Sequence, residues 1–167
     1  MTTIKGFYDY TEEELRGGIA NGTYHMRVTE SEADTWDDGR PRLNIRTEVA
    51  SGDNAGAYGP RHTWSLGSYS GVTGEGRAFT ITEETNQKKL INNIMSIMNG
   101  RTPVVTNPTS WDMALLEELS TQLVDEEFVC TISSGKNGYQ KVDKFYAMSS
   151  PPSGFKLART EARAFNV

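Results

Sequence analysis

The sequence predicts a mainly β domain with a helical segment, and three observations support this fold class. Five stretches alternate hydrophobic and polar residues with a period of two, as half-buried strands do. They are residues 22–29, 42–49, 61–66, 127–133 and 139–148. Between Thr85 and Asn99 the apolar residues recur with a period near 3.6, as on one face of a helix. Asp-Gly and Asn-Gly steps at 38–39 and 137–138 indicate hairpin turns.

The first half of the chain predicts a meander of three strands. The turn between the first two strands is expected at residues 33–41, which contain the Asp-Gly step. A loop rich in glycine, aspartate, asparagine and proline at 51–60 separates the second strand from the third. Residues 67–80 carry four glycines and are expected to be flexible or irregular.

The second half predicts two helices and a closing hairpin. Gly100 is a suitable stop for the helix that ends near Asn99, and Ser110 is the expected cap of a second helix. In the last strand Val142 and Phe145 break strict alternation, which predicts a bulge near Asp143.

Three strands, a helical insertion and two further strands follow the order of an OB-fold. We therefore expect a five-stranded OB-like barrel with the helical insertion between strands 3 and 4. The barrel domain is expected to cover residues 22–148. Residues 1–21 are predicted to be an arm with one helical turn over 12–16, and residues 149–167 a flexible tail.

Composition limits the class of protein. The 167 residues suit one domain, and the net charge of −5 counts against a uniformly basic surface but not against a local one. No stretch approaches the roughly 20 apolar residues of a membrane span, and no signal peptide is visible. A single cysteine, Cys130, excludes an internal disulfide. These features predict a cytoplasmic protein without membrane contact.

Several segments resemble a phage-encoded family, formerly of unknown function, whose members are regarded as OB-fold single-stranded DNA-binding proteins. These segments are Gly22–Tyr24, Leu43–Val49, Lys89–Ile94, Phe128–Ile132 and Gly138–Val142. The resemblance implies a protein that coats single strands in phage replication or recombination within the host cytoplasm. It also implies replication or recombination proteins as partners, and a homo-oligomer is compatible with it. The tail departs from many single-strand binders, because it carries Lys156, Arg159 and Arg163 where they are acidic.

Binding a single strand requires cations along the backbone and aromatic faces for the bases. The first hairpin and its turn offer candidates, which are Arg27, Trp36, Arg40, Arg42 and Arg46. The closing hairpin offers further candidates, which are Lys136, Tyr139, Lys141, Lys144 and Tyr146. Trp36 has no apolar neighbours in the sequence, which favours an exposed ring, although the aspartates around it would repel phosphate.

Other notable residues are better interpreted as structural. Trp64 and Tyr24 belong to apolar strand faces, and Trp111 is expected to pack at the start of the second helix. Cys130 alternates with Phe128 and should be a core residue rather than a nucleophile.

No constellation in the sequence predicts catalysis, a cofactor or a metal site. The two histidines, His25 and His62, have no third ligand at a spacing that suits a metal. Two other classes of protein stay open. One is a protein-interaction module, or a phage accessory or structural protein without nucleic acid, which the acidic balance favours. The other is a small hydrolase, for which the sequence offers no set of candidate catalytic residues.

Overall fold

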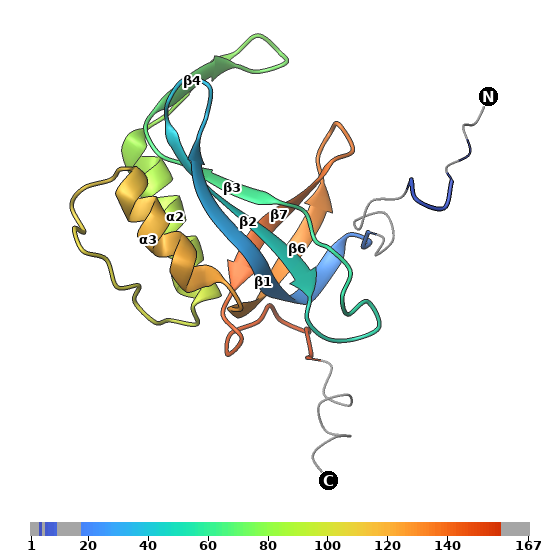
Figure 1. The fold of residues 1–167 in the computed structure, drawn as a ribbon. Helices are drawn as coiled ribbons and strands as arrows, with labels where there is room; N and C mark the ends of the chain where they lie inside the picture. Colours follow the sequence, from blue (N-terminus) through green and yellow to red (C-terminus); the bar gives the residue numbers. More distant parts are fainter. Residues whose placement is uncertain (1–3, 5, 10–17, 158–167) are drawn as a thin grey trace.

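The computed structural model describes residues 4, 6–9 and 18–157. The predicted helical turn over 12–16 and residues 158–167 of the predicted tail lie outside this part of the chain. Figure 1 shows the order of the elements. They are β1 (Gly22–Thr35), β2 (Pro41–Val49), β3 (His62–Ser65), β4 (Tyr69–Val72), β5 (Ala78–Ile81), α2 (Glu83–Ile97), α3 (Met113–Leu123), β6 (Glu127–Ser134) and β7 (Gln140–Tyr146).

The mainly β prediction is confirmed. Five strands form one antiparallel sheet in the order β3-β2-β1-β6-β7. The sheet is not closed into a barrel by backbone pairing, because β3 and β7 are its two ends. Side chains meet across this opening instead. The ring of Phe145 in β7 lies 4.9 Å from that of His62 and 5.6 Å from that of Trp64, both in β3.

Both helices pack on the inner side of the sheet and leave the outer face of β1 and β2 uncovered (Figure 1). Their buried side chains meet the inward residues of the strands in one core. The fully buried members of that core include Met26, Leu43, Ile45, Leu90, Leu116 and Phe128. The expected helix near 85–99 and the alternating strand faces are therefore confirmed.

The cap of the second helix was predicted at the wrong residue. Asp112 caps α3, since its Oδ1 accepts a hydrogen bond from the backbone N–H of Leu115 at 3.1 Å. Ser110 lies in the preceding loop, where its Oγ accepts from the side chain of Asn107 at 2.9 Å. Asp112, two residues after Ser110, is also a preferred capping residue and stands directly before the helix.

The expectation for residues 67–80 was also wrong, because they form the β4–β5 hairpin. Two of the glycines have structural roles in this hairpin. Gly76 takes a φ of 82° in the turn. At Gly71 a Cβ would come within 2.8 Å of the Phe79 ring, so a glycine is needed for that ring to pack there.

The predicted bulge at Asp143 is confirmed by the β6–β7 register. Thr131 pairs with Lys144 and Ile132 pairs with Val142, which leaves Asp143 as the extra residue. A second bulge was not predicted. Val28 pairs with Thr47 and Glu30 with Arg46, so Thr29 is the extra residue of β1. Neither helix among the described residues has the length and apolar character that crossing a bilayer requires.

Candidate functional site

The outer face of β1 and β2 brings most of the predicted arginines together with carboxylates. β1 continues to Thr35, farther than expected, and this extension places Asp34 opposite Arg42. The Arg42 guanidinium donates hydrogen bonds to the Asp34 carboxylate. Arg46 lies 3.9 Å from Glu30, and Arg27 forms an ion pair with Glu48. These cations are therefore partnered on the strand surface.

Arginine partners also lower the pKa values of two carboxyl groups in the first hairpin. The hydrogen bond from Arg42 lowers the pKa of Asp34 below its ordinary value. The hydrogen bond from the side chain of Arg40 lowers the pKa of Asp38 in the same way. Both aspartates are thus ionised at neutral pH, and a phosphate that approaches these arginines must displace a carboxylate.

Trp36 lies in the β1–β2 turn, and the residue is 36% exposed. The turn is closed by a hydrogen bond from the Trp36 N–H to the Arg40 carbonyl at 2.9 Å, and Gly39 supplies a φ of 89°. Arg42 places its guanidinium carbon 4.3 Å from the centroid of the Trp36 ring. The indole Nε1–H donates to Ser65 Oγ at 2.8 Å. These contacts hold the indole at the surface between Arg42 and β3.

The β4–β5 hairpin adds aromatic residues that the sequence interpretation missed. The Tyr69 ring lies 5.0 Å from the guanidinium carbon of Arg40 and 5.9 Å from the ring of Phe79. Tyr69 is almost half exposed. A weak signal was present in the sequence, because Phe79 and Ile81 alternate with Thr80 after residues 73–77. The number of glycines outweighed it.

The β6–β7 hairpin carries the remaining predicted residues, and they are held more loosely. Lys136 at its tip lies 3.4 Å from Glu75 of the β4–β5 turn. Tyr139 is 76% exposed. Lys141 is 4.0 Å from Asp143, and the ammonium of Lys144 lies 5.1 Å from the centroid of the Tyr146 ring.

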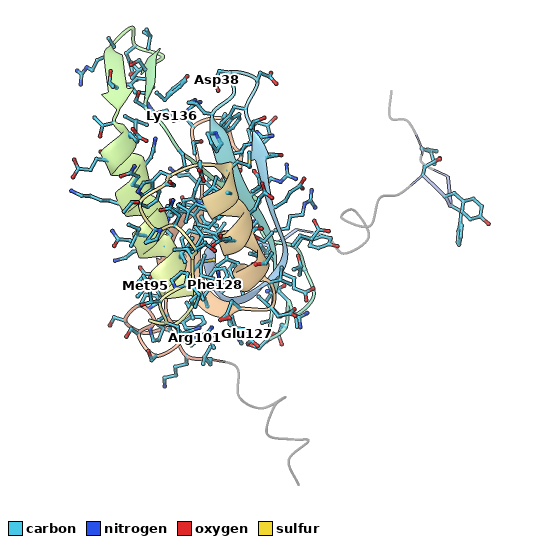
Figure 2. All side chains as sticks on the ribbon, turned by 60° about the vertical axis from the view of Figure 1, so that its left-hand side comes forward. Asp38, Met95, Arg101, Glu127, Phe128 and Lys136 are labelled. Atoms are coloured by element: carbon cyan, nitrogen blue, oxygen red, sulfur yellow. The ribbon has the colours of Figure 1, made fainter. Side chains whose placement is uncertain are left out.

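The tips of three hairpins point to the same end of the molecule (Figure 1). Figure 2 shows Asp38 and Lys136 at that end, with Arg101 and Glu127 at the opposite end. The β4–β5 hairpin contacts both of the other two, through Tyr69 and through Glu75. The structure thus brings the turn residues Trp36, Arg40, Lys136 and Tyr139 to one end, around the third hairpin. It does not bring Arg27 or Tyr146 there, because Arg27 pairs with Glu127 and Tyr146 with Val129 toward the opposite end (Figure 2).

The residues interpreted as structural are buried or packed against the core. Trp64 and Cys130 are buried, and burial raises the pKa of the Cys130 thiol to about 12, so this thiol is not activated. Tyr24 and Trp111 pack against the core and are partly buried. His25 bonds Ser51 and Glu127, and the described residues contain no group of three potential metal ligands.

A comparison of the sequence with protein-family models and with curated proteins found no match. The function of this site therefore has to be argued from its own chemistry.

Proposed function

We propose that the protein binds single-stranded DNA without sequence preference, across the outer face of β1, β2 and β3 and past the hairpin tips. The observation that carries this proposal is the exposed Trp36 ring with the Arg42 guanidinium on it, next to the pairing of Arg40 with Tyr69. Aromatic faces and guanidinium groups are the two surfaces on which bases stack. Each stacked base contributes about 1–3 kcal/mol in such proteins.

The strand order supports an OB-like barrel as the frame of this site. The sequence of pairings β3-β2-β1-β6-β7 is that of an OB meander joined to a closing hairpin. The ring contacts between β3 and β7 bring the ends of the sheet toward closure. In this interpretation α2 and α3 form the insertion between barrel strands 3 and 4, and OB-folds are partly open barrels.

The carboxylates on this surface set the expected strength of binding. Six of the seven predicted cations have a carboxylate within 4.0 Å. Ion pairs between largely exposed side chains, such as Lys136–Glu75, are individually weak and screened by salt, so a phosphate can replace the carboxylate at small cost. The Arg27–Glu48 pair is an exception, because Glu48 is buried. The proposal therefore implies moderate affinity with a clear salt dependence.

We further propose the biological setting that such binding suits. The protein would coat single strands during phage DNA replication or recombination in the host cytoplasm. Its partners would be the replication or recombination proteins of phage or host, and copies would associate along one strand. Sequence-independent coating needs no cofactor and no catalytic group.

A second candidate function is a protein-interaction module. It is favoured by an apolar hollow of about 210 Å³ between α2, α3 and the segment that joins them. Leu90, Ile94 and Trp111 line this hollow, and Ile91 on its wall is exposed. The many carboxylates beside the arginines favour the same alternative.

Titration with fluorescent oligo-dT over a range of salt concentrations separates the two candidates. Single-strand binding predicts saturable binding at low salt, with the logarithm of the affinity falling by about 0.7 per phosphate contact for each decade of salt. Duplex DNA of equal length is the control and should bind more weakly. If oligo-dT does not bind at low salt, the proposal is wrong and the interaction module becomes the better account.

A further inference from the structure

A polar hollow of about 380 Å³ lies at the opening between β3 and β7. We call it the seam hollow. All four residues of β3 line it, together with Val142 and Asp143 of β7. On its third side, α2 contributes Asn86, Lys89 and Asn93. The hollow thus lies where the two end strands of the sheet meet the polar face of a helix.

Trp64, one of the residues that line the seam hollow, carries a buried donor without an acceptor in the described ranges. Trp64 is 4% exposed, and its indole Nε1–H has no hydrogen-bond partner among the described residues. Buried N–H groups without an acceptor are uncommon in native proteins, which sets this side chain apart from the rest of the core. The neighbouring His62 ring lies 4.5 Å from the Trp64 ring, and burial followed by the charge of Lys89 lowers the pKa of His62 to about 4. At neutral pH the hollow therefore contains a neutral imidazole that can donate and accept.

Lys89 is the cation available to a ligand there. The preceding lysine, Lys88, forms an ion pair with Glu84 at 3.2 Å. In the described part of the chain no carboxylate forms an ion pair with Lys89, and Lys89 lines the hollow. It is thus placed to meet an anionic group at the mouth of the hollow.

The seam hollow adjoins the proposed stacking surface. Ser65 lines the hollow, and its Oγ accepts the hydrogen bond from Trp36 Nε1 at 2.8 Å. A strand with one base on Trp36 would therefore pass the edge of β3 and reach the hollow with a neighbouring nucleotide.

We infer that the seam hollow takes one nucleotide of the bound single strand. Lys89 contacts its phosphate, while Asn93 and His62 supply hydrogen-bonding groups for the base edge, and the Trp64 ring lies in the wall beside them. The inference rests on the proposed function and adds a second, more enclosed subsite beside Trp36.

The test compares Lys89→Gln with Lys88→Gln in the full chain, using salt titrations with oligo-dT. Because Lys88 is adjacent on α2 but does not line the hollow, it is the matched control. We expect Lys89→Gln to reduce the salt slope by about 0.7, the value for one lost phosphate contact, and Lys88→Gln to leave it unchanged. In ¹H–¹⁵N spectra the Trp64 indole signal, assigned with Trp64→Phe, should shift when oligo-dT is added.

The outcomes separate the two proposals. If the wild type binds oligo-dT, the two lysine variants have equal slopes and the Trp64 signal does not move, the seam subsite is wrong and strand binding stands. If the wild type does not bind oligo-dT, the proposed function fails and the subsite fails with it.

Discussion

The β1–β2 and β6–β7 hairpins carry the same kinds of residues but hold them differently. In the first, the Trp36 ring is fixed by Arg42 on its face and by Ser65 at its Nε1. In the second, Tyr139 is 76% exposed, and Lys136 is paired with Glu75 of another hairpin. A side chain that is already ordered loses less conformational entropy when it binds. Under the proposed function, we therefore expect the first hairpin to stack bases and the second to attract phosphate without a fixed geometry.

The largest expected effect comes from removing the ring of the first hairpin. Trp36→Ala should weaken oligo-dT binding about 5- to 140-fold, since a stacked base is worth about 1–3 kcal/mol. Tyr139→Ala should weaken it roughly threefold at most, because that ring must be ordered on binding. Fluorescence anisotropy with labelled oligo-dT measures both variants.

The control for this pair is Trp36→Phe, which keeps an aromatic face but loses the hydrogen bond to Ser65. It should retain most of the affinity. Circular dichroism should show native folding for all three variants, because neither ring belongs to the core. Equal losses for Trp36→Ala and Tyr139→Ala would contradict the division of roles between the hairpins.

A smaller effect, in the opposite direction, is expected from removing a carboxylate. Asp34→Asn leaves Arg42 without its ionised partner, so the arginine becomes available to phosphate. We expect about a two- to fivefold gain in oligo-dT affinity at low salt and a steeper salt slope by about 0.7. Salt titrations of the variant and the wild type give both numbers.

The matched change for the β6–β7 hairpin is Glu75→Gln, which removes the carboxylate that is paired with Lys136. Its effect should be smaller, because both side chains of that pair are largely exposed and already screened by water. If Asp34→Asn lowered the affinity, Arg42 would not be a phosphate contact.

The sequence predicted those features that depend on local pattern. The alternation of hydrophobic and polar residues predicted the five strands of the main sheet. The glycines after Asp38 and Asn137 predicted the two hairpin turns. The break in alternation between Val142 and Phe145 located the bulge at Asp143. Each of these signals lies within a few residues of the structure that it specifies.

What the sequence did not predict depends on register and on tertiary contacts. The bulge at Thr29 sets which carboxylate faces which arginine, and no local pattern reveals it. No local pattern shows which arginine meets the Trp36 ring, and the structure places Arg42 on it, from the strand that pairs with β1. Tyr69 joined the site only because the 67–80 segment folds back as a hairpin beside Arg40.

The most direct test of the account follows the three indole N–H signals of the wild type while oligo-dT is added. Trp36 lies on the proposed binding surface and Trp64 lines the seam hollow. Trp111 lines the apolar hollow between the helices and serves as the internal control. We predict that the Trp36 signal shifts with saturation while the Trp111 signal stays in place. A titration in which Trp36 does not move, or in which Trp111 alone moves, would contradict the account.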